Sequence, residues 1–281
     1  MSRLQAKISS YLAFLIFLSS LYLWLAPYCG AAADLNSFQT DGATAWQNKN
    51  YDKSLMLAKL GLKNYPLDPS LTILASHSCV YLDKPAEAMK FRDQALALPN
   101  LSFQNYSNIL KISSELEDYK IAYSTAKIAL KKFPNSTHLR LESAMSSHSL
   151  GYLKESRQLF QNYLALEPSN FSAWLELMDI SKEMTDWLAV KNTGDKMEQV
   201  AAKNKVVQES IIYARCLAAK ADGHIHLEQW QQARSCLERA IKIIPLERPI
   251  LAQHLMVCTK MHDTNAIKNA KSKLAEFDNG L

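Results

Sequence analysis

Residues 103–136, FQNYSNILKISSELEDYKIAYSTAKIALKKFPNS, hold one complete unit of the pattern that decides the fold. The segment predicts two helices, Asn105–Leu116 and Tyr119–Phe133, separated by the short polar turn Glu117–Asp118. Pro134–Asn135 then ends the second helix, because proline cannot continue a helix. We expect a helical hairpin in which small residues of the second helix let the two helices approach closely.

The same pattern recurs with a period of 34 residues. Prolines recur at Pro66, Pro134 and Pro168, with Pro99 one place before the corresponding position. Small residues of the second helices recur at the same step: Ser54, Ala88, Ala122 and Ser156. Self-similarity at a fixed step is typical of an array built from one repeated supersecondary unit. The predicted units are 35–68, 69–102, 103–136, 137–170, 171–204, 214–247 and 248–281.

The fifth unit departs from the pattern. Three residues stand where two small residues and a proline are expected: Gly194, Met197 and Ala202. Residues 205–213 then form an insertion or linker between repeats 1–5 (residues 35–204) and repeats 6–7 (residues 214–281). We expect a second helix lengthened over Lys191–Val207, and a domain boundary at the same place is the alternative.

These hairpins resemble the tetratricopeptide repeat, which places Trp and Leu-Gly in its first helix, small residues in its second, and a closing proline. The matching residues are Trp174 and Leu177 at the opening, and Ala122, Ala126, Ala129 and Pro134, with Ala233, Ala240 and Pro245, at the close. Met178 stands where glycine is usual. The resemblance covers nearly everything after residue 34, and it implies an all-α, tetratricopeptide-like helical-hairpin solenoid of six to seven units.

The first 33 residues have a different character. Ile8–Ala33 contains no charged side chain, Tyr11–Leu25 is almost wholly apolar, and Arg3 and Lys7 precede both. This pattern indicates a membrane-targeting segment, residues 1–33, which is either a cleaved signal peptide or an uncleaved signal anchor that tethers the protein to the membrane. The positive-inside rule places the repeats outside the cytoplasm in both cases. We therefore expect an exported protein, either periplasmic or anchored in the inner membrane.

Charge and motifs argue against nucleic-acid binding and against catalysis. The net charge of +5 comes from scattered basic residues and not from a concentrated patch. The sequence has no glycine-rich phosphate loop, no nucleophile elbow and no zinc-protease motif. We therefore predict a non-enzyme without catalytic residues, cofactor or metal.

One alternative places a metal or catalytic site in the last two repeats. His254, Cys258 and His262 are spaced by four, which would put them on one helix face, and zinc accepts such ligands. His224 and His226 lie in the preceding repeat. The competing interpretation is that His254 and Cys258 are core residues. The cysteines after residue 34 are expected to be buried free thiols, with disulfides as the alternative in an oxidising compartment: Cys79, Cys216, Cys236 and Cys258.

The resemblance implies that the first helix of each repeat lines a concave groove. The predicted groove residues mix aromatic, apolar and isolated charged groups: Trp46, Ile73, His77, Tyr81, Lys111, Leu141 and Met145. We expect the groove to hold a peptide segment of a protein partner, although Trp46 could instead only pack the first hairpin. The predicted function is a protein–protein interaction scaffold of the cell envelope that supports assembly, secretion or polymer export by a membrane machine. The same scaffold in a eukaryotic secretory lumen is the alternative.

Overall fold

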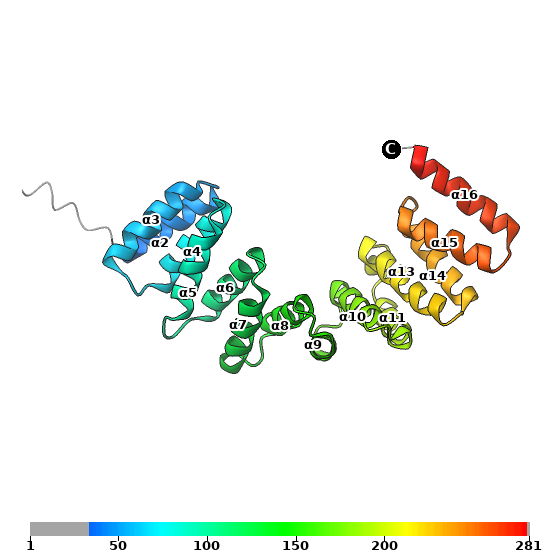
Figure 1. Ribbon diagram of the computed structural model, residues 1–281, viewed down its shortest axis with the longest axis horizontal. Helices are drawn as coiled ribbons and strands as arrows, with labels where there is room; N and C mark the ends of the chain where they lie inside the picture. The colour runs from blue at the N-terminus through cyan, green and yellow to red at the C-terminus, as the bar shows by residue number, and fades with distance from the viewer. Residues whose placement is uncertain (1–33, 280–281) are drawn as a thin grey trace, which may run out of the picture. The chain divides into compact units, whose positions relative to one another are not determined.

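The computed structural model describes residues 34–279, and this range contains helices, turns and no strand (Figure 1). The predicted all-α array of helical hairpins is confirmed, with fifteen helices in the described range. In chain order they are α2 (Leu35–Gln47), α3 (Tyr51–Asn64), α4 (Pro69–Tyr81), α5 (Pro85–Leu96), α6 (Phe103–Glu115), α7 (Tyr119–Lys132), α8 (Thr137–Ser149), α9 (Leu153–Leu166), α10 (Phe171–Glu183), α11 (Trp187–Ala201), α12 (Lys205–Gln208), α13 (Ile211–His226), α14 (Trp230–Ile243), α15 (Arg248–Lys260) and α16 (Thr264–Asn279).

The helices belong to two compact units. The first compact unit ends at Ile112 within α6, and the second begins at Ser113. The helices pack mainly against helices of the same or the adjacent hairpin, as α2 does against α3 and as α11 does against α13. Packing between adjacent hairpins is the arrangement expected of a repeat protein.

The turn inside every hairpin contains one residue in the left-handed conformation. These residues follow one another at steps of 34 positions, except for one step of 43 between Thr185 and Glu228: Lys49, Asp83, Glu117, Gly151, Thr185, Glu228 and His262. The following residue donates its backbone N–H to a carbonyl five residues earlier, as Asn50 does to Ala45 at 2.9 Å. This bond closes the first helix of the hairpin. The turns therefore confirm the 34-residue period, with nine extra residues before Glu228.

Polar side chains cap the start of most helices. Asp68 accepts a hydrogen bond from the backbone N–H of Leu71 at 2.7 Å. Pro69 is the first helical residue, and its ring already fixes φ near the helical value. Equivalent side-chain caps begin other helices: Asp34, Asn50, Asp118, Ser136, Asn170, Asp186, Asn204 and Ser210. Each cap stabilises its helix by about 1 kcal/mol. These polar residues also fix where each hairpin starts.

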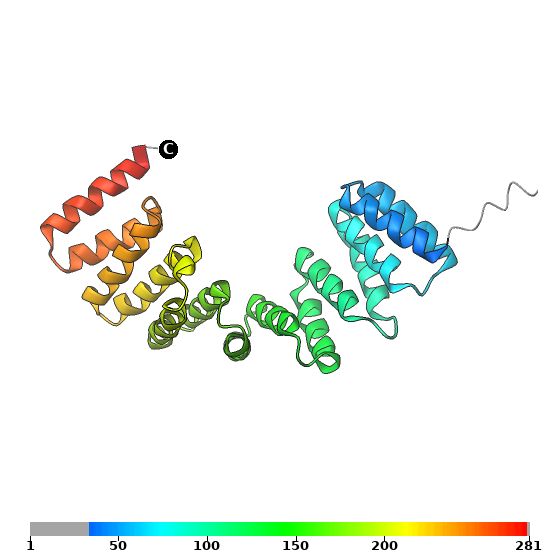
Figure 2. The same cartoon turned by 180° about the vertical axis from the view of Figure 1, so that it is seen from behind.

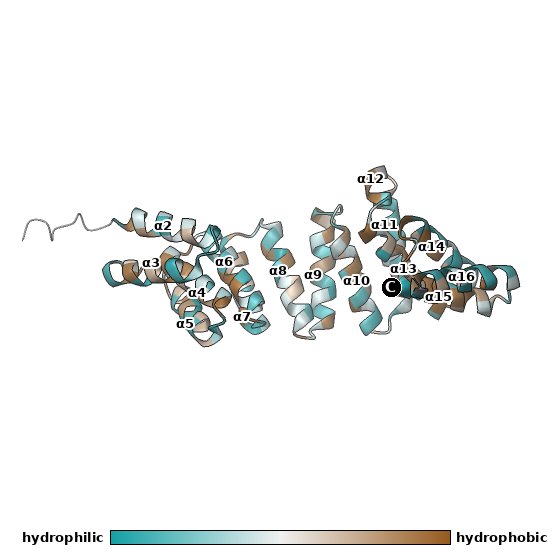
Figure 3. Ribbon diagram, turned by 90° about the horizontal axis from the view of Figure 1, so that it is seen from above, coloured by the Kyte–Doolittle hydropathy of each residue, from teal (hydrophilic) through white to brown (hydrophobic). Residues whose placement is uncertain are grey.

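Small buried residues let the two helices of a hairpin pack closely. The predicted small residues Ser54, Ala88, Ala122 and Ser156 are all 0% exposed. Two hairpins add a hydrogen bond from a serine hydroxyl to a backbone carbonyl of the other helix, from Ser76 of α4 to Ala88 of α5 at 2.7 Å and from Ser156 of α9 to Ala144 of α8 at 2.9 Å. Most helices carry both hydrophobic and hydrophilic residues, so their polar faces remain available for other contacts (Figure 3).

The predicted long helix over Lys191–Val207 is wrong. Helix α11 ends at Ala201, and the separate short helix α12 follows before α13 begins at Ile211. Asn204 causes the break, because its side chain accepts a hydrogen bond from the backbone N–H of Val207 at 3.4 Å and caps a new helix. Helix α13 packs against both α10 and α11, so the hairpin packing continues across the insertion.

The predicted targeting segment, residues 1–33, lies outside the described residues. Within residues 34–279, every helix falls short of the length and apolarity that crossing a bilayer requires.

Candidate functional site

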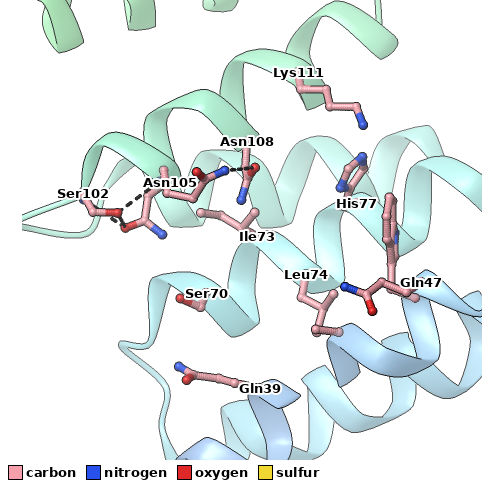
Figure 4. A pocket seen from close by; sticks show the side chains of 13 residues that line it. Gln39, Gln47, Ser70, Ile73, Leu74, His77, Ser102, Asn105, Asn108 and Lys111 are labelled. Atoms are coloured by element: carbon pink, nitrogen blue, oxygen red, sulfur yellow. Dashed lines mark hydrogen bonds between the residues drawn. The ribbon is translucent and has the colours of Figure 1, made fainter. Parts of the chain in front are cut away.

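A pocket of about 520 Å³ opens in the first compact unit between α2, α4 and α6 (Figure 4). These are the first helices of three consecutive hairpins. Gln39 and Gln47 extend from α2, Asn108 and Lys111 extend from α6, and His77 lies on α4 between them (Figure 4). We call this site the α2–α4–α6 pocket. The lining residues are Gln39, Ala43, Trp46, Gln47, Ser70, Ile73, Leu74, His77, Ser102, Gln104, Asn105, Asn108 and Lys111.

An aromatic cluster borders the pocket, and two of its rings, Trp46 and His77, belong to the lining. The Trp46 ring lies 4.6 Å from the His77 ring and 5.6 Å from the Tyr81 ring, and Tyr81 stacks on Tyr51 at 4.8 Å, all between ring centroids. The Lys111 Nζ lies 5.7 Å from the Trp46 ring centroid, at the distance of a cation–π contact. The cluster therefore gives the pocket an aromatic wall, and the positive charge of Lys111 lies over the Trp46 ring of that wall.

Primary amides make up much of the remaining lining. Gln104 donates from Nε2 to Asn108 Oδ1 at 3.0 Å, and the Oδ1 of Asn105 accepts hydrogen bonds from the backbone N–H and the hydroxyl of Ser102. Gln39 donates to Asp68 at 3.0 Å. A primary amide has two N–H donors and a carbonyl that accepts twice, so these bonds leave further donors and acceptors facing the pocket. Such groups match the N–H and C=O groups of a peptide backbone.

The structure brings most of the predicted groove residues together. Trp46, Ile73, His77 and Lys111 line the α2–α4–α6 pocket, although Ile73 is only 4% exposed and forms its floor. Tyr81 is 44% exposed and contacts the aromatic cluster from outside the lining. The two remaining residues, Leu141 and Met145, lie on α8 in the second compact unit. Leu141 packs against the core there, and Met145 is 46% exposed.

Trp46 also has a packing role. Its ring contacts three other rings, and its indole N–H is buried without a hydrogen-bond partner among the described residues. A buried donor without a partner costs about 1–3 kcal/mol. The stabilisation that Trp46 provides therefore comes from ring packing, and part of its role is to hold the first hairpins together.

Several polar lining residues were missing from the sequence prediction. Ser102, Gln104, Asn105 and Asn108 all line the pocket from α6 or the turn before it. The 34-residue step contained the necessary signal, because the lining residues Ser70, Leu74 and His77 of α4 correspond at that step to Gln104, Asn108 and Lys111 of α6. The two helices thus present equivalent positions to the same pocket.

The histidines and cysteine of the last two repeats do not form the predicted alternative site. His254 Nε2 lies 3.5 Å from Cys258 Sγ, but His262 follows the end of α15 in a left-handed turn and so does not share their helix face. His224 pairs with Gln229 at 2.7 Å, and His226 stacks on a tryptophan. Within residues 34–279, no group of three or more potential ligands could hold a metal ion.

The four cysteines of the described range are buried free thiols. Burial raises the pKa of the Cys79 thiol to about 11, that of Cys216 to about 12 and that of Cys236 to about 11. These thiols are protonated at neutral pH, and the thiolate is the nucleophilic form. Their surroundings are therefore those of structural cysteines.

Solved structures with the same architecture support this description. The C-terminal part of a tetratricopeptide-repeat-containing protein from Cytophaga hutchinsonii superposes with a TM-score of 0.64 at 13% identity, covering 86% of this chain and 95% of that one. PilF of Pseudomonas aeruginosa gives 0.54 at 15% identity, covering 80% and 97%. MamA from Desulfovibrio magneticus RS-1 gives 0.53 at 15% identity, covering 63% and 95%.

No family model and no curated protein matches the sequence. At the identities of these solved structures the likeness concerns the fold. The 34-residue period, the hairpin turns and the neighbouring structures agree with one another. The chain therefore has the fold of the tetratricopeptide-repeat proteins.

Proposed function

We propose that the chain is a non-catalytic protein–protein interaction scaffold, and that the α2–α4–α6 pocket binds a peptide segment of its partner. The observation that carries this proposal is the pocket itself. It is lined from the first helices of three consecutive hairpins, and it combines an aromatic wall, a lysine and amides with unused hydrogen-bonding capacity. Aromatic side chains in interfaces contribute strongly to binding energy, and amides can pair with any peptide backbone.

The second part of the proposal concerns location. The charge-free segment Ile8–Ala33, preceded by Arg3 and Lys7, supports export and a role in the cell envelope. There the scaffold would support assembly, secretion or polymer export by a membrane machine. Intact-mass analysis of protein from the native membrane fraction tests the segment: a mature chain that begins at Asp34 indicates a cleaved signal peptide, and a retained Met1 indicates an anchor.

Partner binding is tested with a substitution that fills the pocket without touching the aromatic cluster. Asn108 is half-buried in the lining, so Asn108→Arg places a long charged side chain in the pocket. Gln94 is exposed on α5 outside this pocket, and Gln94→Arg is the matched control with the same added charge. We expect a partner that co-purifies with the wild-type chain to be lost from Asn108→Arg and retained by Gln94→Arg, at equal melting temperatures. Retention by both variants would exclude the pocket.

A further inference from the structure

A second pocket, of about 380 Å³, lies in the second compact unit, where α15 packs against both α14 and α16. These three helices are coloured orange to red in Figure 2. Ile241 from α14, Pro245 from the turn after α14 and Ala270 from α16 supply its apolar surface. Lys242 of α14 and Lys273 of α16 supply positive charges from two sides. Asn269, His254 and Glu238 complete the lining. We call this site the α14–α16 groove.

Among the residues that the structure describes, the two lysines of the groove have no acidic partner. Neither Lys242 nor Lys273 makes an ion pair or hydrogen bond with another residue of the range 34–279. The one carboxylate in the lining, Glu238, is held by Arg234, whose Nε lies 2.7 Å from its Oε1. Arg234 also pairs with Asp263 at 2.8 Å. Arg234 is thus shared between two carboxylates, so Lys242, Lys273 and Arg234 exceed Glu238 and Asp263 by one positive charge.

His254 lines the α14–α16 groove, and its pKa depends on the charges around it. Its side chain is 12% exposed, and its Nε2 lies 3.8 Å from Glu238 Oε1. Burial lowers the pKa of His254, the Glu238 carboxylate raises it, and the positive charges of Arg234 and Lys273 lower it further. The charge of Lys273 on α16 therefore acts on an imidazole of α15. A negative charge bound between the lysines would act on the same imidazole in the opposite direction.

We propose that the α14–α16 groove binds a carboxylate side chain of an acidic segment of a protein partner. Two ammonium groups and the Asn269 amide can each donate to a carboxylate, and charge-assisted hydrogen bonds are the strong ones. The apolar surface of Ile241 and Pro245 suits the methylene groups of a glutamate. A singly charged group also fits better than a doubly charged phosphate, because the Glu238 carboxylate lines the same groove.

The test uses the full chain in detergent and an acetylated hexapeptide that contains three glutamates and carries an uncharged dye. Fluorescence anisotropy measures its affinity against a peptide in which the glutamates are glutamines. We expect binding to the glutamate peptide only, and an affinity about tenfold lower for the Lys242→Gln/Lys273→Gln variant, equivalent to about 1.4 kcal/mol. The matched control is Lys196→Gln/Lys203→Gln, which removes two exposed lysines of the same compact unit from outside the groove. It should bind within about twofold of the wild type.

An NMR titration of the histidine resonances gives a second measurement, the pKa of His254. Peptide bound non-specifically elsewhere on the protein would leave this pKa unchanged. A bound carboxylate should raise the pKa of His254, and the signal is assigned with His254→Gln. Because the bound state then holds its proton more tightly, affinity should increase as pH falls through the pKa of the bound form. The groups that face His254 are Glu238, Arg234 and Lys242 from α14, Cys258 from α15, and Lys273 from α16.

Four results would overturn the proposal. They are equal affinity for both peptides, no binding at about millimolar peptide, equal losses in the groove and control variants, and a His254 pKa that the peptide leaves unchanged. Inorganic phosphate and acetate are also compared as competitors of the peptide. If phosphate displaces the peptide at a lower concentration than acetate does, the groove prefers phosphate and the proposal of a carboxylate ligand is wrong. The α2–α4–α6 pocket takes no part in this experiment, so failure here leaves the proposed function standing.

Discussion

Each hairpin turn holds one residue in the left-handed conformation, and exchanging glycine and threonine at two of these positions measures what that conformation costs. Thr185 is β-branched and has a φ of 55°, whereas Gly151 has a φ of 73° at the equivalent position one repeat earlier. The left-handed conformation costs an L-residue about 1–2 kcal/mol and costs glycine nothing. Glycine in turn loses about 0.5–1 kcal/mol more conformational entropy on folding. Thr185→Gly should therefore stabilise the second compact unit by about 0.5–1 kcal/mol, and Gly151→Thr should destabilise it by a similar amount.

The structure isolates the backbone effect at these positions. A Cβ atom at Gly151 would meet no other atom within 4 Å, so steric overlap adds nothing to the cost. Urea denaturation followed by circular dichroism should move the midpoint in opposite directions for the two variants, with an unchanged slope. Ser172→Gly, at the exposed second residue of α10, is the control and should lower the midpoint. A Thr185→Gly variant that is less stable than the wild type would refute this account of the turns.

Three further substitutions test packing and electrostatics. Ala126 is 0% exposed, so Ala126→Leu should cost about 1–3 kcal/mol, and an unchanged denaturation midpoint would show that the register of the third repeat is wrong. A Cβ at Gly194 would lie 2.7–2.8 Å from three side-chain carbons of Lys220, so Gly194→Ala should destabilise by about 1–2 kcal/mol, although an alanine in a helix is normally favourable by about 1 kcal/mol. A gain in stability would refute that contact. Burial raises the pKa of Glu142, so its ionised form is disfavoured in the folded chain; Glu142→Gln should raise stability at pH 7, and the gain should disappear as pH falls below the ordinary glutamate pKa of about 4.3. A gain of equal size at about pH 3 would assign the effect to packing.

Much of the fold follows from the sequence because the repeat imposes the same requirements many times. Small residues such as Ala88 and Ala122 recur where two helices pack closely, and prolines recur where a helix must end. The fifth repeat was harder to predict. Residues Lys191–Val207 have a composition compatible with one long helix, and the break depends on a single side chain, Asn204, which caps a new turn instead of continuing the old one. A break that depends on one capping residue is not repeated along the chain, so the periodicity of the sequence does not predict it.

The pocket was predictable in part. Trp46, His77 and Lys111 were identified because the first helices of a repeat array carry its exposed functional side chains. The amides of α6 were missed because polar residues on a helix surface have no distinctive pattern, and only the equivalence of α4 and α6 at the 34-residue step singles them out. The packing of Trp46 among three rings depends on tertiary contacts that no local pattern encodes.

Site-specific photo-crosslinking tests whether a partner segment occupies the α2–α4–α6 pocket. A photoreactive phenylalanine derivative replaces Asn108 in the pocket, and in a second protein it replaces Gln94, which is exposed on α5 outside the pocket. We expect one discrete crosslinked protein from position 108, formed in the native membrane fraction and absent from position 94. A partner that co-purifies with the chain but crosslinks from position 94 and not from position 108 would contradict it.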